Sequence, residues 1–249
     1  MIPSVRTRHT PVLAFKSTLQ TCMFKAWRSP VPYLAAFWLT ATMTPPSLAS
    51  DTPVKVDAST SADVRTAFPR DGRLVLTFLG YSAAGYEDER AMIAKASAIL
   101  NEYPVATTIV NIGATSDGIG AIYELARRRG YYTTGIVSSK AKDDNVPLSK
   151  HVEMVIYVKD DTWGGVLPGT RVLSPTSRAI VDNSDVMVAI GGGAIARDEV
   201  QAAHAEGKSV RYIAADMNHA IAIERARKAG SPAPTDFSSA VGAVLRSER

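Results

Sequence analysis

Six short apolar segments, rich in β-branched side chains, recur along residues 74–213. In chain order they are Leu74–Leu79, Thr107–Ile112, Tyr132–Val137, Met154–Val158, Val186–Ile190 and Ser209–Ile213. Most are continuous runs and lack the regular polar alternation that a solvent-facing side would produce. This pattern is typical of strands in a parallel sheet that is covered on both faces.

Segments with helical spacing lie between these strands, and one more follows the last strand. They are Glu87–Glu102, Ile119–Arg129, Ser177–Asn183, Ile195–Glu206 and His219–Ala229. Alternating strands and helices predict a Rossmann-like, doubly wound α/β fold, with a parallel sheet of about six strands in a single domain. We assign residues 71–230 to this domain. Within 231–249 we expect a C-terminal helix, about Phe237–Ser247, that packs on it.

The first 49 residues have the plan of a secretory signal peptide. Lys25 and Arg28 precede an apolar stretch over 31–43, and Ser47 and Ala49 supply the small residues that predict cleavage after Ala49. The alternative is a retained membrane anchor, but about 13 apolar residues fall short of the roughly 20 that span a bilayer. We therefore expect an exported protein, periplasmic or secreted, with no stable membrane anchor after cleavage. Residues 50–70, rich in Ser, Thr, Asp and Pro, are predicted to be a linker.

The charge distribution argues against a nucleic-acid partner. The formal net charge is +4, but five of the 28 basic residues and no acidic residue lie in 1–49. Residues 50–249 therefore carry 23 basic and 24 acidic side chains, a net charge of −1. The single cysteine, Cys22, lies in the leader, and His151, His204 and His219 show no metal-ligand spacing. We expect neither a metal nor a cofactor.

Three loops rich in glycine and small residues each follow a predicted strand and precede a helix: Gly80–Gly85, Gly113–Gly120 and Gly191–Ala194. In a doubly wound sheet the ligand lies at the carboxyl ends of the strands, where glycine lets the backbone approach a phosphate at a helix N-terminus. The candidate binding residues are Gly80, Ser82, Gly113, Ser116, Gly118, Gly191, Gly192, Gly193 and Ala194. The alternative is turn chemistry alone, because tight strand-to-helix turns also favour glycine.

Two longer stretches resemble a known family. Residues 109–138, IVNIGATSDGIGAIYELARRRGYYTTGIVS, and residues 183–210, NSDVMVAIGGGAIARDEVQAAHAEGKSV, resemble corresponding segments of the LOG family, once called lysine-decarboxylase-like. The wider group includes the DNA-processing protein A domain, and the resemblance covers roughly residues 73–215. It implies nucleotide binding, a homodimer, and hydrolysis of the N-glycosidic bond of a nucleoside 5′-monophosphate, which releases the base and ribose 5-phosphate.

The family motif, GGxGTxxE with an upstream arginine, indicates the residues for this chemistry. Glu199 takes the place of the glutamate if Gly192 and Gly193 are the motif glycines, whereas an alignment from Gly191 makes Asp198 the carboxylate. Isoleucine and alanine replace the Gly-Thr pair in this chain. Arg178 is the candidate upstream arginine, about two residues closer to the following Ser-Asp pair than the family pattern.

Three functions remain open at this stage: the hydrolase, a non-catalytic module that binds a nucleotide or phosphate ligand in the periplasm, and an interaction protein with an empty site. Glu199 could also be a first-turn acid favoured by the helix dipole, and Arg178 a solvated helix residue. Trp163 lies in a Gly/Pro-containing loop, where it could stack on a base, cover the site or serve packing.

Overall fold

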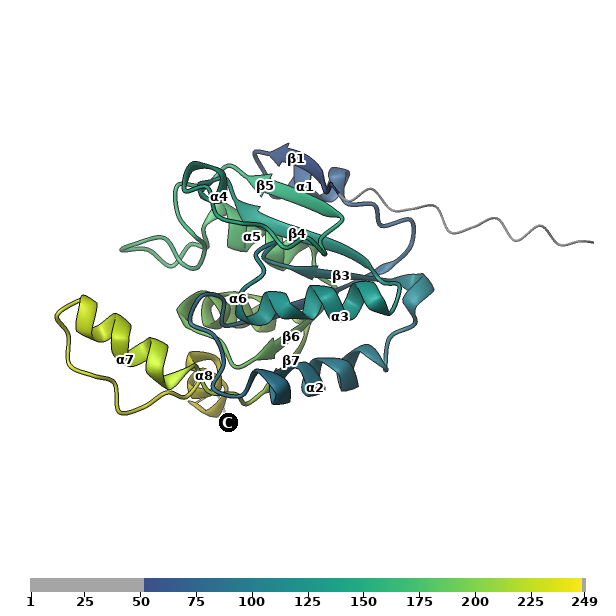
Figure 1. Ribbon diagram of the computed structural model, residues 1–249. Coiled ribbons are helices and arrows are strands. Elements are labelled where there is room, and N and C mark those ends of the chain that lie inside the picture. The colour runs from purple at the N-terminus through teal and green to yellow at the C-terminus, as the bar shows by residue number, and fades with distance from the viewer. Residues whose placement is uncertain (1–51, 248–249) are drawn as a thin grey trace, which may run out of the picture. The chain divides into compact units, whose positions relative to one another are not determined.

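Residues 52–247 are described by the computed structural model, and they form a parallel sheet with helices on both faces (Figure 1). The strands are β1 (Val54–Ala58), β2 (Leu74–Gly80), β3 (Thr108–Ile112), β4 (Tyr132–Ser138), β5 (Met154–Val158), β6 (Val186–Ile190) and β7 (Ser209–Ile213). They pair in the order β1-β5-β4-β3-β2-β6-β7, and all six pairings are parallel. The predicted doubly wound fold is confirmed, with seven strands instead of about six.

The extra strand corrects the prediction of a linker over residues 50–70. That segment forms β1, which pairs with β5 at one edge of the sheet, and α1 (Ser61–Ala67). Helix α1 begins with a capping box, in which Thr60 Oγ1 accepts a hydrogen bond from the Asp63 N–H and the Asp63 carboxylate accepts one from the Thr60 N–H. The predicted signal peptide, residues 1–49 with cleavage after Ala49, lies outside the described residues.

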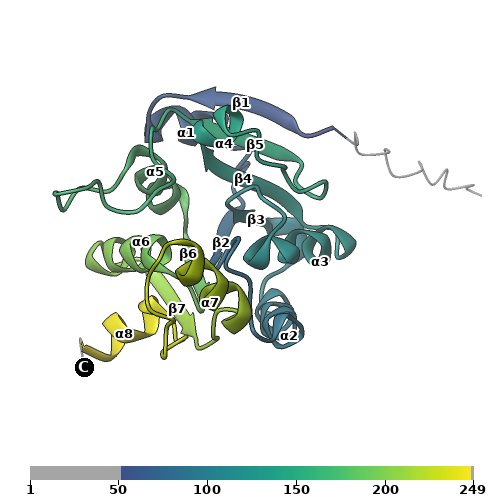
Figure 2. The ribbon, with the colours of Figure 1, turned by 60° about the vertical axis from the view of Figure 1, so that its left-hand side comes forward.

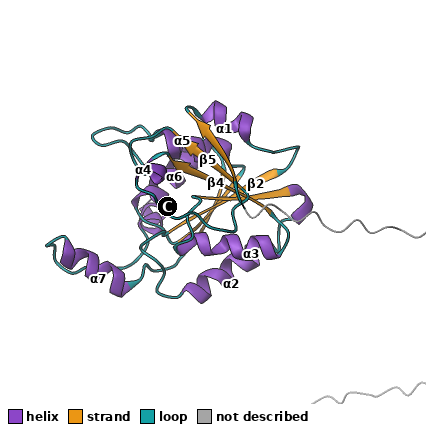
Figure 3. Cartoon of the chain, turned by 45° about the horizontal axis from the view of Figure 1, so that its top comes forward, coloured by secondary structure: helices purple, strands orange, loops and turns teal. Residues whose placement is uncertain are grey.

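The remaining helices alternate with the strands. They are α2 (Glu89–Leu100), α3 (Ile122–Arg128), α4 (Lys140–Asp143), α5 (Pro175–Asn183), α6 (Ala194–Ala205), α7 (His219–Lys228) and α8 (Ala240–Ser247), with short 3₁₀ helices η1 (Val105–Thr107) and η2 (Gly118–Ala121). Figure 3 shows helices on both sides of the sheet. No described helix is long and apolar enough to cross a membrane.

The two faces of the sheet bury separate apolar clusters because side chains alternate along each strand. Leu76 and Phe78 of β2 pack with α2 and α3, whereas Val75 and Leu79 pack with α1, α5, α6 and α8. Figure 2 shows α2 and α3 on one side of the sheet and α5 and α6 on the other. Helix α7 has no buried residue and extends away from the sheet in Figure 1.

Strand order determines where the switch point of the sheet lies. The chain passes from β2 to β3, β4 and β5 on one side, and then returns to place β6 and β7 on the other side of β2. The switch point therefore lies between β2 and β6, where a doubly wound sheet has its binding crevice. The three glycine loops follow β2, β3 and β6, so they lie at the carboxyl ends of three adjacent strands.

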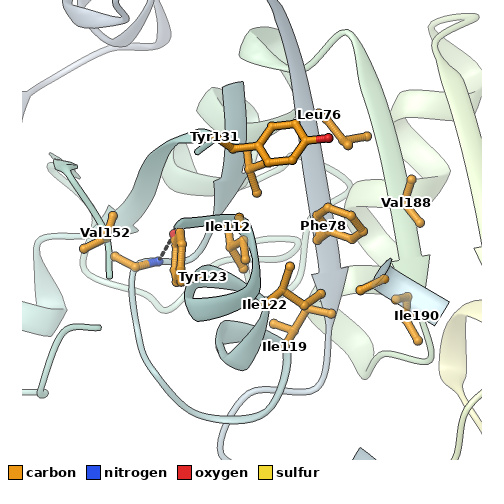
Figure 4. Close-up of a cluster of buried hydrophobic side chains, with 14 of the residues drawn as sticks. Leu76, Phe78, Ile112, Ile119, Ile122, Tyr123, Tyr131, Val152, Val188 and Ile190 are labelled. Atoms are coloured by element: carbon orange, nitrogen blue, oxygen red, sulfur yellow. Dashed lines mark hydrogen bonds between the residues drawn. The ribbon is translucent and has the colours of Figure 1, made fainter. Parts of the chain in front are cut away.

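Tyr123 links α3 to the sheet from inside the larger cluster (Figure 4). Its side chain is fully buried, and its hydroxyl donates to the Thr134 carbonyl at 2.8 Å and accepts from the Ala114 N–H at 3.1 Å. Burial raises the pKa of Tyr123 well above its usual value, so the hydroxyl stays neutral.

We expect Tyr123→Phe to lower the free energy of unfolding by about 1–3 kcal/mol, because it leaves the buried Ala114 N–H and Thr134 carbonyl without this partner. Urea unfolding of the two proteins at neutral pH measures the difference. A change below about 0.5 kcal/mol would show that the hydroxyl contributes no net stability.

Candidate functional site

A cavity of about 710 Å³ opens at the carboxyl ends of β2, β3 and β4, beside the loop that follows β6. Its volume lies within the usual range for small-molecule sites. All three glycine loops contribute to its walls. The sequence-predicted residues that line it are Gly80, Ser82, Gly113, Gly193, Ala194 and Glu199.

The predicted residues Ser116 and Gly118, in the second loop, are not among the described residues that line the cavity. Gly118 has a φ of +54°, and a Cβ there would overlap the carbonyl oxygens of Tyr81 and Ser82. The next residue, Ile119, donates its N–H to the Tyr81 carbonyl at 2.7 Å, which ties the second loop to the first. The Ser116 hydroxyl reaches only its neighbour, the Asp117 carboxylate, at 3.4 Å.

The three consecutive glycines after β6 have different roles. Gly191 and Gly192 have φ angles of +61° and +117°, which favour glycine. A Cβ would also lie 2.6 Å from Tyr81 Cε2 at Gly191 and 2.8 Å from Ala196 Cβ at Gly192. The fold alone therefore requires glycine at these two positions.

Gly193 and Gly113 have no such requirement. Gly193 is extended, with φ −86° and ψ −158°, and no heavy atom lies within 4 Å of the position of its Cβ. At Gly113 the Cβ position is equally open, and φ lies outside the left-handed region. Both residues line the cavity, and a side chain at either position would meet open space.

The N-terminus of α6 faces this space without a cap. Gly193 is its N-cap residue and offers no side chain, so the first-turn N–H groups have no partner within the helix. Helix α5 differs: Ser174 caps it, and Asp160 accepts a hydrogen bond from the Thr176 N–H at 2.9 Å. An internal carboxylate thus occupies the N-terminus of α5, whereas that of α6 is open to an anion from solution.

Glu199, on α6, lies in the cavity wall and is 3% exposed. The Ser177 hydroxyl donates to its Oε1 at 2.7 Å and accepts the Gly165 N–H at 2.7 Å. Burial raises the pKa of Glu199 to about 7; the Ser177 hydrogen bond opposes this shift and the nearby Asp198 charge adds to it. Near neutral pH the carboxyl group can therefore hold or release a proton at the cavity wall.

Asp198, the alternative motif carboxylate, faces the loop before α5. Its Oδ2 accepts the Val166 N–H at 2.9 Å, and its Oδ1 pairs with Arg197 at 2.7 Å. It is not among the described residues that line the cavity. Of the two carboxylates, the structure places Glu199 at the cavity.

Arg178 is not brought to the cavity. Its guanidinium forms ion pairs with Asp182 and Glu206, each at 2.6 Å. The arginine that lines the cavity is Arg225 of α7, whose Nη2 donates to the Ala83 carbonyl at 2.7 Å. From the sequence, Arg225 has only the pattern of a cation that complements the C-terminus of its own helix.

Comparison with known proteins supplies only distant structural similarities. No protein-family model and no curated protein matches the chain. The structure is similar to that of the molybdenum cofactor carrier protein from Chlamydomonas reinhardtii, with a TM-score of 0.41, 18% identity, and coverage of 70% of this chain and 96% of that chain. It is also similar to the molybdenum cofactor binding protein from the phototrophic bacterium Rippkaea orientalis, with a TM-score of 0.41, 19% identity, and coverage of 56% and 76%. Similarity at this level assigns neither a family nor a function.

The structure adds polar groups to the cavity wall that sequence reasoning missed. Asn111 Nδ2 donates to Thr77 Oγ1 at 3.2 Å within the sheet. Thr176 of α5 is 3% exposed. All three residues line the cavity. A signal for Asn111 was available, because an asparagine interrupts an otherwise apolar strand.

The start of α8 and the residue before it contact the glycine loop that follows β6. The Ser239 hydroxyl and the Ala240 N–H both donate to the Gly192 carbonyl at 3.0 Å. Val241 is fully buried and packs in the same cluster as Ala196 of α6. The described residues contain no group of three or more His, Cys, Asp or Glu side chains arranged to hold a metal ion.

Proposed function

We propose that this chain binds a nucleotide or another phosphate-bearing small molecule in the cavity at the β2–β6 switch point. The proposal depends chiefly on the presence of glycine at position 193. Neither its backbone conformation nor its packing requires glycine, yet its missing side chain leaves the uncapped N-terminus of α6 open to the cavity. A phosphate group there would accept hydrogen bonds from the first-turn N–H groups and meet the positive end of the helix dipole.

Other groups in the cavity suit the same class of ligand. Arg225 supplies a positive charge, and the side chains of Asn111 and Thr176 add polar groups to the wall. Apolar side chains, including Ile136, Ile180 and Ile195, supply surface for the uncharged part of the ligand. The LOG-like stretches of the sequence support the same ligand class, and the leader supports binding outside the cytoplasm after export.

Gly193→Ala tests the phosphate position directly. We expect a loss of about 10-fold or more in affinity for a bound nucleoside 5′-monophosphate, because the added methyl group lies in the space that the phosphate would occupy. The free energy of unfolding should fall by less than about 1 kcal/mol, because Ala adopts the Gly193 conformation without strain. Calorimetric titration and urea unfolding measure the two quantities.

Gly192→Ala is the matched control, because its Cβ would overlap Ala196 and its φ is unfavourable, so it should lose stability. The ligand itself is found by thermal unfolding against nucleoside monophosphates, ADP-ribose, NAD and ribose 5-phosphate. At 100 times its Kd a ligand adds about 2.7 kcal/mol to the free energy of unfolding. No stabilisation by any of these compounds, or equal binding by wild type and Gly193→Ala, contradicts the proposal.

The second candidate is hydrolysis of an N-glycosidic bond, and Glu199 favours it. In this reaction a water oxygen bonds to C1′ of the ribose, the C1′–N bond breaks, and the base leaves with a proton. A carboxyl group with a pKa of about 7 in the cavity wall can deliver that proton or orient the water. Chromatography of a nucleotide incubation detects the free base. Glu199→Gln should then lower the rate by about 100-fold or more, whereas binding without base release supports the binding module.

A further inference from the structure

Trp163 is a large aromatic side chain at the edge of the cavity. It lines the cavity and is 42% exposed, and it belongs to neither of the two buried apolar clusters. No described aromatic ring stacks on it; the Lys140 ammonium lies 5.9 Å from its ring centroid. A packing role would place this ring among other side chains, so its surface is available to a molecule in the cavity.

The loop that carries Trp163 is held in place on both sides. Before the tryptophan, Asp160 Oδ1 accepts the Thr162 N–H and the Thr162 hydroxyl, each at 2.8 Å. After it, the Gly165 N–H donates to Ser177 Oγ and the Val166 N–H donates to Asp198 Oδ2. The backbone that carries the exposed ring is therefore held by hydrogen bonds on both sides. This preorganisation reduces the conformational entropy that the loop would lose when a ligand binds.

The glycine after Trp163 brings this loop against the start of α6. Gly164 has a φ of +126°, and a Cβ there would lie 3.1 Å from Ile195 Cγ2 in the first turn of that helix. Ile195 is also exposed at the cavity, at 40%. A flat apolar surface and the uncapped helix N-terminus thus lie in neighbouring parts of one cavity wall.

We propose that Trp163 is the platform on which a planar ring of the ligand stacks, so that the protein selects phosphate compounds that carry an aromatic base over those that carry only a sugar. This inference rests on the proposed function and names the residue that recognises the base. Stacking tolerates any nucleobase, because every base presents a π-face, and it contributes about 1–3 kcal/mol per base, equivalent to about 5- to 150-fold in affinity.

The test compares the four common nucleoside 5′-monophosphates with ribose 5-phosphate, which has the same phosphate and sugar without the base. The full chain is used with Trp27→Phe and Trp38→Phe, so that Trp163 is its only tryptophan. We expect the nucleotides to quench Trp163 fluorescence and to bind about 5- to 150-fold more tightly than ribose 5-phosphate. Trp163→Ala should remove this preference and leave the affinity for ribose 5-phosphate unchanged, while Trp163→Phe retains most of it.

Val172→Ala is the control, because Val172 is an exposed apolar residue of the same loop that is not among the described cavity-lining residues. It should change neither affinity. Equal binding of ribose 5-phosphate and the nucleotides, or an equal loss of both in Trp163→Ala, overturns the role of Trp163 and leaves the proposed function standing. Binding of neither compound overturns the proposed function, and the role of Trp163 with it.

Discussion

Glu199→Gln is expected to raise the free energy of unfolding at pH 8 by about 3 kcal/mol and to have little effect near pH 4. The folded protein raises the pKa of Glu199 from 4.5 to about 7, chiefly by burial. As the pH rises from about 4.5 to 7, the unfolded chain loses this proton first, so the stability of the wild type falls across that window. The difference of about 2.5 pKa units corresponds to about 3 kcal/mol.

Glutamine removes the ionisation and still accepts the hydrogen bond from Ser177. Urea unfolding of both proteins from pH 4 to 8 gives the difference curve. Glu206→Gln changes the exposed carboxylate that follows α6, so it should retain the wild-type slope, since Glu199 remains. A flat difference between wild type and Glu199→Gln would show that folding leaves the pKa of Glu199 at its ordinary value, and would contradict the prediction.

Asp160→Ala is expected to lower the free energy of unfolding by about 2–4 kcal/mol at neutral pH, because it removes a buried acceptor from two N–H groups and a hydroxyl. Burial alone would raise the pKa of Asp160, but the hydrogen bonds from the N–H groups and side chains of Thr176 and Thr162 outweigh it and lower the pKa. The stabilisation is therefore present above the ordinary value of 3.8 and is lost as the pH falls through the lower folded pKa.

Asp160→Asn keeps one carbonyl oxygen and should lose about half as much as Asp160→Ala. Hydrogen exchange at the Thr162 and Thr176 amides identifies the region affected. Equal stability of Asp160→Ala and wild type at pH 7 would contradict the anchoring role that we assign to this carboxylate.

Much of the sheet could be predicted from the sequence because its strands are buried on both faces. Val186–Ile190, for example, is a run of five apolar residues, all of them buried. A short continuous apolar run of this kind is typical of a strand that is covered on both faces of a sheet. The missed strand, β1, contains Lys55 and Asp57, and most of it is exposed at the edge of the sheet. It is held by backbone pairing with β5, and backbone pairing leaves no mark in a hydropathy pattern.

The candidate site could be predicted in part for a related reason. The glycine loops could be found in the sequence, and in a doubly wound sheet the ligand site lies at the carboxyl ends of the strands that such loops follow. The arginines depended on tertiary contacts: Arg178 is paired by Glu206, 28 residues away, and Arg225 reaches the cavity from a helix beyond the last strand. The three consecutive glycines after β6 cannot be told apart in the sequence. Their φ angles and the atoms around their Cβ positions show that the fold requires glycine at the first two and not at Gly193.

The hydrogen bonds that Ser239 and Ala240 donate to the Gly192 carbonyl come from near the C-terminus, which the ribosome synthesises last. All seven strands precede residue 214, so a ribosome-bound chain can hold the complete sheet while its glycine loop still lacks this support. The ligand binding that we propose would then be one of the last properties the protein acquires during synthesis. A chain that has not yet incorporated Ser239 and Ala240 would lack the complete site.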